Sequence, residues 1–462
     1  MLDNMKKALD SFSNKDVSFA DIRLEDRSGT FFLVTNGALR TFNRSSTAGS
    51  VARALVGECW GTASSSMPLK GKGYLELLEK AAKRAKACSK YSRREIDLSG
   101  TEGIEKTIWQ KVKEDPSNVS AEEKIELVMA LDKAQKIDEK IVSSNSVYQD
   151  SRRIYRLVNT VGAKLEWDES RVRVMTQAVA REGGNLQIDY DIEDGTAGYE
   201  LARNVNPEEL GSEAAKGAIE LLSAEKPPSG KLTTVIDGNI AGLIAHEVCG
   251  HASEADEVVK GRSFLTGLVG KEIGTELVSM VDDGTLKGPM GSLPFDSEGT
   301  PSSRNPIIEN GVFKGYLHTL ETAVLMGVQP TGNGRAQDYN RRISARMTNT
   351  FFDKGDWKDE EIIADTKDGL YIIKGTSGME DVVGGGVQAT ALKGYIIKNG
   401  EKTQLVRRLS IAGNVLELLK TVDAVGNTLV FNGGNCGKGE EDFIPVSSGG
   451  PHMRVELTVG GG

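Results

Sequence analysis

The sequence predicts an α+β fold, rich in antiparallel strands and with comparatively few helices. Residues 16–24 alternate apolar and polar side chains over much of their length, which is typical of a half-buried strand. A second strand-like run, at residues 30–35, is followed by Asn36-Gly37, a dipeptide that favours a β-hairpin. Most of the 53 glycines lie between short runs of this kind, so we expect many tight turns.

The first half of the chain is expected to combine such strands with helices. Ser120 and Glu123 have the spacing of a capping box, which predicts a helix start. Asn206 and Pro207 give a second start signal, because a capping residue precedes a proline in the first turn. In chain order, the expected elements are a strand at 49–57, helices at 74–90 and 124–137, strands between 139 and 191, and a helix from 206 to about 223. Solvated charges at the edge of this sheet are expected at three arginines: Arg152, Arg153 and Arg156.

Residues 224–231 form the clearest linker in the chain, with two adjacent prolines followed by Ser-Gly. We therefore predict two domains: an N-terminal α/β domain of antiparallel strands and helices at 1–226, and a strand-rich C-terminal domain at 231–462. The second domain is expected to begin with a strand at 233–237 that turns into an apolar helix. Glycine-punctuated strands follow, with a late helix at about 415–422.

Composition excludes several classes of protein. A length of 462 residues with 38% hydrophobic and 27% charged residues is typical of a soluble globular protein. The net charge of −9 argues against a general nucleic-acid-binding protein, which normally has a basic surface. No run approaches the roughly 18–20 apolar residues of a membrane span, and the first residues lack an apolar signal core, so a cytoplasmic protein is expected. Four scattered cysteines are too few for a disulfide framework and remain free to bind metal.

The apolar helix leads into His-Glu-Val-Cys-Gly-His at residues 246–251, which contains two of the four histidines. Two imidazoles beside a carboxylate suit zinc-assisted hydrolysis, in which the nitrogens hold the ion and the carboxylate takes a proton from water. The histidines are five residues apart, about 140° of rotation on a regular helix. Both reach one ion only if the helix widens into a single-turn bulge or ends near His251. Gly250 makes such a break easy.

The motif alone leaves two interpretations open. A pattern this short also arises by chance, in which case His246 and His251 are ordinary helix residues. Two histidines are, in addition, one or two ligands short of a zinc site.

Further motifs decide between these interpretations. They are Asn36-Gly37, the run at 49–53, Trp60-Gly61, the runs at 281–285, 296–301, 309–317, 330–335 and 346–350, Cys436-Gly-Lys438, and the run at 457–461. Together with the histidine motif, this ordered set covers essentially the whole chain and resembles the TldD/PmbA family of metalloproteases. Within the family it is similar to the TldD branch, because the PmbA branch lacks the metal motif.

The resemblance implies a zinc ion held by His246, His251 and Cys436, with Glu247 as the general base and a fourth position left for water. It also implies hydrolysis of small or unfolded peptides inside a closed cavity formed by two subunits. The expected partner is a PmbA/TldE-like subunit or a second copy of this chain. A peptide held as an added strand would suit the strand-rich second domain.

Residues near the motif leave alternatives open. Cys249 would face away from both histidines on a regular helix, so we expect it to pack rather than bind metal. Glu254 and Asp256 either orient a ligand or are solvated carboxylates. Lys438 either stabilises the thiolate of Cys436 or is a solvated loop lysine. Structural roles are expected for the two remaining histidines, His318 and His452.

A second hypothesis is a non-catalytic peptide-binding or assembly subunit whose metal is structural. A structural zinc site normally has four protein ligands, whereas a catalytic site keeps one position open. Three convincing ligands favour catalysis, and a fourth, such as Cys249 or Glu254, would favour the structural role.

Overall fold

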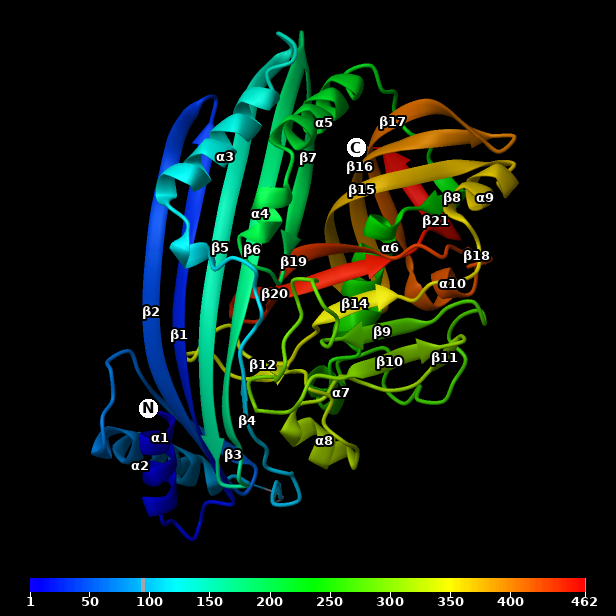
Figure 1. Cartoon of the computed structure of the whole chain (residues 1–462). Coiled ribbons are helices and arrows are strands. Elements are labelled where there is room, and N and C mark those ends of the chain that lie inside the picture. Colours follow the sequence, from blue (N-terminus) through cyan, green and yellow to red (C-terminus); the bar gives the residue numbers. More distant parts are fainter. Residues whose placement is uncertain (93–95, 462) are drawn as a thin grey trace.

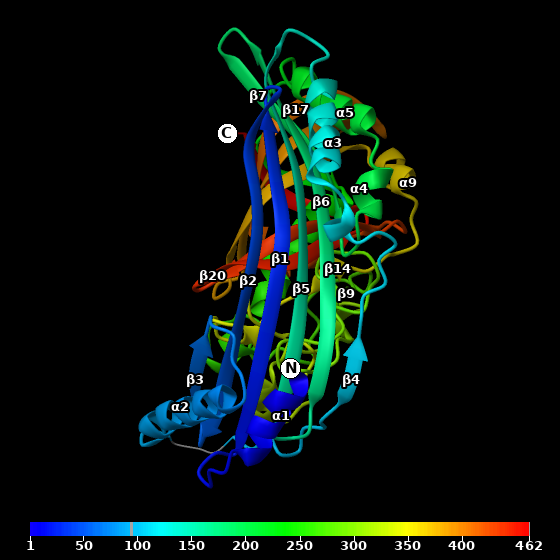
Figure 2. The ribbon, with the colours of Figure 1, turned by 60° about the vertical axis from the view of Figure 1, so that its left-hand side comes forward.

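The computed structural model describes residues 1–92 and 96–461, and its largest feature is a seven-stranded sheet formed by the first half of the chain. The strand order is β3-β2-β1-β5-β6-β4, and β7 also pairs with β6. Figures 1 and 2 show that the longest of these strands run most of the length of the molecule. The strands are β1 (Phe19–Thr35), β2 (Ala38–Val56), β3 (Cys59–Ser65), β4 (Glu105–Ile108), β5 (Ile141–Asn159), β6 (Lys164–Glu182) and β7 (Asn185–Gly195).

The predicted hairpin at Asn36-Gly37 is confirmed. Both residues have positive φ, 53° and 80°, as a two-residue hairpin turn requires. The two runs predicted before the turn are one strand, because the pairing of β1 with β2 and β5 continues without interruption through residues 25–29.

Helices cover one face of this sheet. Alternate residues of β1, such as Ile22 and Phe32, are fully buried beneath them. The predicted start signals are confirmed, since Ser120 accepts a hydrogen bond from the Glu123 amide and Asn206 accepts from the two amides after Pro207. The helices of this half are α1 (Leu2–Ser11), α2 (Lys72–Ser89), the short 3₁₀ helix η1 (Pro116–Asn118), α3 (Ala121–Ala134), α4 (Glu200–Asn204) and α5 (Pro207–Glu220).

The opposite face of the sheet packs on the second half of the chain through buried polar groups. Arg53 bonds Glu298 at 3.1 Å, and Arg171 donates to the Met290 carbonyl at 2.7 Å. The prediction for Arg152, Arg153 and Arg156 is wrong, because β5 lies in the middle of the sheet between β1 and β6. Arg153 is buried and donates to the Gln337 carbonyl at 2.9 Å. Arg152 and Arg156 lie on the helix-covered face and pair with carboxylates there.

The second half contains two six-stranded sheets. In the first, the order is β17-β16-β15-β8-β21-β18, and pairing of β17 with β21 closes it into a small barrel. Its strands are β8 (Gly230–Ile236), β15 (Asp368–Asp381), β16 (Gly386–Lys398), β17 (Glu401–Asn414), β18 (Ala424–Val425) and β21 (Met453–Gly461). The second has the order β11-β10-β9-β14-β20-β19. Its strands are β9 (Met280–Asp283), β10 (Arg304–Glu309), β11 (Val312–Phe313), β14 (Asn349–Phe352), β19 (Val430–Lys438) and β20 (Glu441–Gly450), and a separate pair joins β12 (Gly334–Arg335) to β13 (Ser344–Ala345).

The helix α6 (Gly238–Ile244) lies between these two sheets and contacts β15 of one and β20 of the other. The other helices of this half are α7 (Ala255–Val259), α8 (Leu320–Met326), α9 (Asp359–Asp365) and α10 (Val415–Leu419), the last at the place of the predicted late helix but shorter. The architecture is α+β with a strand-rich second half, as predicted (Figure 1). In the part of the chain that the structure describes, no helix has the length and apolar character to cross a membrane.

Candidate metal centre

The helix that carries the histidine motif begins directly after β8. Asp237 caps it by accepting a hydrogen bond from the Ile240 amide at 2.9 Å. After α6 the helix widens into a π-helical segment, η2 (Ala245–Gly250), and the His251 amide bonds the His246 carbonyl five residues back. The widened turn predicted from the spacing is therefore confirmed. It brings the two imidazole rings together, with centroids 5.1 Å apart.

Glycines place this helix directly against β20. A side chain at Gly242 would lie 2.4 Å from the Gly449 amide nitrogen, and one at Gly238 would lie 2.3 Å from the Gly450 carbonyl oxygen. Both distances are too short for any Cβ, so only glycine permits this approach. Because β20 pairs with β19, the contact also sets the distance between the motif and Cys436 on β19.

Three buried donor atoms converge at the end of this helix. The Nε2 atoms of His246 and His251 lie 3.1 and 3.3 Å from the Sγ of Cys436. Zinc bonds of about 2.0–2.3 Å place tetrahedral ligand atoms roughly 3.3–3.6 Å apart, close to these separations. Burial opposes ionisation of Cys436, but the two imidazoles outweigh it and lower the pKa of the thiol to about 5. Two imidazoles and a thiolate are a donor set that suits zinc.

Glu254 and Asp256 lie behind these donors. The Nδ1 of His251 is 3.2 Å from the Oε2 of Glu254, which is almost fully buried. The Nζ of Lys438 lies 3.0 Å from the same oxygen and 2.7 Å from the Oδ1 of Asp256. Of the alternatives left open by the sequence, Glu254 is thus a partner of His251, and Lys438 binds carboxylates rather than standing in solvent.

Arg346 is a further charged residue in contact with Glu254, and the sequence analysis did not single it out. It is fully buried, with Nη1 3.0 Å from Glu441 and Nε 3.5 Å from Glu254. Burial alone would lower the pKa of its guanidinium, but the charges of Glu254 and Cys436 raise it. The only sequence signal for Arg346 was its place at the start of one of the family motifs.

Glu247 points from η2 toward β15. A side chain at Gly378 would lie 2.3 Å from the Cγ of Glu247, so β15 runs directly against the glutamate. Glu380, two residues further along β15, has a carboxylate oxygen within 4.8 Å of donor atoms of both Glu247 and His251. Burial raises the pKa of Glu247 to about 7, and the Glu380 carboxylate adds to this. Sequence reasoning missed Glu380, which no motif marks.

Comparison with known proteins identifies the family. Residues 20–89 match domain 1 of the PmbA/TldA metallopeptidases, residues 114–222 match their central domain, and residues 229–461 match their C-terminal domain. The chain belongs to the TldD/PmbA metallopeptidase family. A metalloprotease of Methanocaldococcus jannaschii is 35% identical over 96% of each chain. A protein named metalloprotease TldD homolog from Buchnera aphidicola is 29% identical over 98% of this chain and 95% of its own length.

Solved structures share the fold of this TldD/PmbA chain. A putative modulator of a DNA gyrase from Thermotoga maritima superimposes with a TM-score of 0.82 at 24% identity, over 99% of this chain and 100% of its own. TldE from Thermococcus kodakarensis gives a TM-score of 0.77 at 20% identity, again over 99% and 100%.

The structure does not place Cys249, His318 or His452 among the converging donors. Cys249 is in the hydrophobic core, where burial raises the pKa of its thiol to about 12. His318 is buried beside the Thr322 hydroxyl at 3.3 Å, and His452 bonds the Tyr371 hydroxyl at 2.8 Å. None of these three belongs to a converging donor group among residues 1–92 and 96–461.

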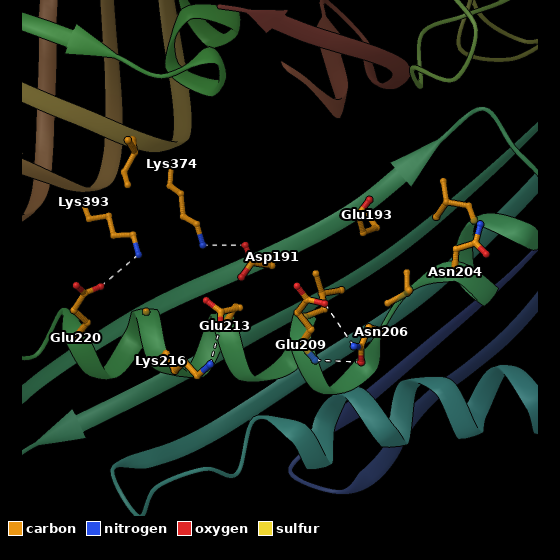
Figure 3. A pocket seen from close by; sticks show the side chains of 15 residues that line it. Asp191, Glu193, Asn204, Asn206, Glu209, Glu213, Lys216, Glu220, Lys374 and Lys393 are labelled. Carbon is orange, nitrogen blue, oxygen red and sulfur yellow. Dashed lines mark hydrogen bonds and ion pairs between the residues drawn. The ribbon is translucent and has the colours of Figure 1, made fainter. Parts of the chain in front are cut away.

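A separate large cleft, of about 760 Å³, lies between α5 and β7 on one side and β15 and β16 on the other (Figure 3). Its charged side chains pair with one another, such as Lys374 with Asp191 at 3.0 Å and Lys216 with Glu213 at 2.7 Å. None of the three converging donors lines it. The size of a cleft alone therefore does not identify the candidate metal centre in this member of the family.

Proposed function

We propose that this chain is a zinc-dependent peptidase that hydrolyses small or unfolded peptides. In this proposal His246, His251 and Cys436 hold the ion, and Glu247 is the general base. The observation that carries it is the convergence of two imidazole nitrogens and a buried thiol beside a carboxylate. The metalloprotease names of the relatives support the same reaction class.

The roles of the residues follow from their contacts. A zinc ion held by the three donors would polarise the peptide carbonyl and a water molecule. Glu247 would accept a proton from that water and pass it to the departing amine. Glu254 would accept the Nδ1 proton of His251 and so keep Nε2 directed at the ion. Lys438 and Arg346 would in turn hold Glu254 in place.

The alternative, a structural metal, would need a fourth protein ligand. Cys249 belongs to no group of converging donor atoms in the described chain, and the oxygens of Glu254 face His251, Lys438 and Arg346. Three protein donors therefore favour a catalytic site with one position left for water.

We also propose that the chain works as a dimer, with a PmbA/TldE-like subunit or with a second copy. Residues 38–48 of β2 have no partner on their outer side within the described structure, because β3 pairs only from Ser50 onward. Phe42 on this edge is 58% exposed. Natural proteins seldom leave such an edge uncovered, which supports a subunit contact there. The fold likeness to TldE supports a partner of that kind.

A cytoplasmic location and a division of the chain into domains at 1–226 and 231–462 complete the proposal. All four cysteines are free thiols, which suits a reducing compartment.

Zinc content, measured by elemental analysis of the full chain, tests the ligand set. We expect about one zinc per wild-type chain, a large loss in Cys436→Ser, and no loss in the matched control Cys249→Ser. Unchanged zinc in Cys436→Ser would remove Cys436 from the site.

Peptide cleavage tests the base. Glu247→Gln should keep the metal and lose nearly all turnover of an unstructured peptide, because the amide cannot accept the proton. Retained turnover in this variant would exclude Glu247 from the mechanism.

A further inference from the structure

Two of the four cysteines, Cys59 and Cys88, lie on elements that pack against each other, and neither belongs to the candidate metal centre. Cys59 is the first residue of β3, and Cys88 lies in the last turn of α2. Cys88 is exposed and Cys59 is partly exposed, whereas Cys249 and Cys436 are buried. A reagent in solution therefore reaches the thiols of β3 and α2 most easily.

The first of two contacts that bring these cysteines together is the packing of β3 on α2 (Figure 2). Alternate residues of a strand face the same side, so Cys59, Gly61 and Ala63 share the side turned to α2. A Cβ at Gly61 would lie 2.3 Å from the Ala85 amide nitrogen, so the two backbones meet at this point. Ala85 and Cys88 are three residues apart, which is the spacing of neighbours on one face of a helix.

The second contact lies on the other side of both cysteines. The Glu58 amide donates a hydrogen bond to the Ser92 hydroxyl at 2.8 Å, which ties the turn before β3 to the chain that follows α2. Cys59 lies between this hydrogen bond and the glycine contact along the strand. Cys88 lies between the same two contacts along the helix and its continuation. Burial raises the pKa of the Cys59 thiol, and the neighbouring Cys88 thiol raises it further.

We propose that Cys59 and Cys88 form a reversible disulfide by exchange with a small-molecule disulfide, and that this bond clamps the end of α2 to the start of β3. The two sulfur atoms belong to different elements, so joining them links the helix covalently to the sheet. The bond also closes the loop between the two residues and restricts the unfolded chain. It uses no residue of the proposed metal site.

The exchange takes place in two steps. The sulfur of Cys88, the more exposed thiol, attacks one sulfur of the oxidant as a thiolate, the S–S bond of the oxidant breaks, and one thiolate leaves. The sulfur of Cys59 then attacks the Cys88 sulfur of the mixed disulfide and expels the second thiolate. The two cysteines lose two protons and two electrons, and the oxidant becomes two thiols. Excess thiol reverses both steps.

The residue after Cys59 connects this end of β3 to the second half of the chain. The Nε1 of Trp60 donates to the Oε2 of Glu321 in α8 at 2.9 Å, and the Cζ of Arg53 lies 4.5 Å from the centroid of the Trp60 ring. Successive residues of a strand face opposite sides, so these contacts lie on the side away from α2. The disulfide would therefore hold the strand end that carries a contact between the two halves.

Oxidised glutathione, added in excess to the full chain, tests the site. Intact-mass spectrometry of the wild type should show the loss of two hydrogen atoms without a glutathione adduct, and peptide mapping should link Cys59 to Cys88. Reduced glutathione should restore the original mass. In Cys59→Ser a glutathione adduct should persist on Cys88, because no second thiol expels the glutathione. Cys249→Ser is the matched control and should behave as the wild type does.

Urea unfolding provides a second readout. The oxidised wild type should unfold at a higher urea concentration than the reduced wild type, because the closed loop lowers the entropy of the unfolded chain. The same treatment should not raise the midpoint of Cys59→Ser or Cys88→Ser. An unchanged mass, a persistent adduct on Cys88 of the wild type, or a disulfide mapped to another cysteine would each overturn the proposal. A fully linked chain with an unchanged midpoint would contradict the clamping of α2.

Discussion

The two ring nitrogens of His251 have different neighbours, and these determine the role of the residue. Nε2 lies toward Cys436, while Nδ1 lies 3.2 Å from Glu254. A carboxylate that accepts the Nδ1 proton leaves the electron pair on Nε2, which is the tautomer a metal ligand needs. In the proposed metal site, Glu254 would therefore position His251, and the ion pair with Lys438 offsets part of the cost of burying Glu254.

Replacing Glu254 by glutamine should weaken zinc binding by about 10- to 100-fold, as loss of an outer partner of a ligand histidine typically does. Zinc affinity would be measured by competition with a chelator. Glu441→Gln is the matched control, because it removes the other carboxylate on Arg346 but does not touch His251. Equal affinities in the two variants would show that Glu254 acts only through packing.

His318 gives a pH dependence that is independent of the metal. Burial lowers the pKa of its imidazole from 6.5 to about 4. Between these values the unfolded chain binds more protons than the folded chain, so this contribution to stability falls as the pH falls. We expect the residue to account for about 2 kcal/mol of the stability lost between pH 7.5 and pH 5. Urea unfolding at both pH values should reveal a smaller loss in His318→Gln; an identical loss would contradict the assignment.

At the scale of elements, short sequence patterns correctly predicted the features that nearby residues determine, namely turns, helix caps and the widened helical turn. The hairpin at Asn36-Gly37, the caps at Ser120 and Asn206, and the widened turn at the histidine motif all follow from short spacings. The position of β5 does not, because a strand is central or at an edge according to segments far away in the chain. Arg153 was therefore mistaken for an exposed residue, although it faces the second half of the protein.

The contact between α6 and β20 makes a prediction at this scale. Gly242→Ala would place Cβ 2.4 Å from a backbone nitrogen, and neither backbone can yield without moving the helix. We expect a destabilisation of about 1–3 kcal/mol, together with weaker zinc binding, because the shift separates the histidines from Cys436. Chemical unfolding and zinc content would be measured together. Gly315→Ala is the control, since a Cβ there meets nothing within 4 Å; equal effects would exclude the proposed role of the contact.

At the scale of the whole molecule, the candidate centre joins residues that are far apart in the sequence. Cys436 lies 190 residues after His246. It was predicted as a ligand only through the family resemblance, because the spacing of residues along the sequence cannot show that a distant strand lies beside the histidine helix. Glu380 and Arg346 could not be predicted as neighbours of the centre for the same reason. Only the folded sheets bring β15 and the loop before β14 next to the helix.

The two halves of the chain are also joined by buried charges, and Asp189 is the clearest case. It is fully buried on β7, and its oxygens lie 2.8 Å from Lys374 and 3.2 Å from Lys393, both on the barrel of the second half. Figure 3 shows these two lysines reaching across the cleft toward the first half. Removing one member of a buried ionic group leaves the others without compensation, which is far more costly than removing an exposed pair.

Asp189→Asn should therefore destabilise the protein by about 3–5 kcal/mol in urea unfolding. The matched control is Asp368→Asn, whose partner Lys398 lies 2.7 Å away with both side chains more than half exposed. That variant should change stability far less, because solvent screens an exposed ion pair. Because Asp189 joins the halves rather than the metal donors, zinc content should stay at the wild-type level in both variants. Similar small effects of the two substitutions would mean that the lysines find other partners and that this cluster does not hold the halves together.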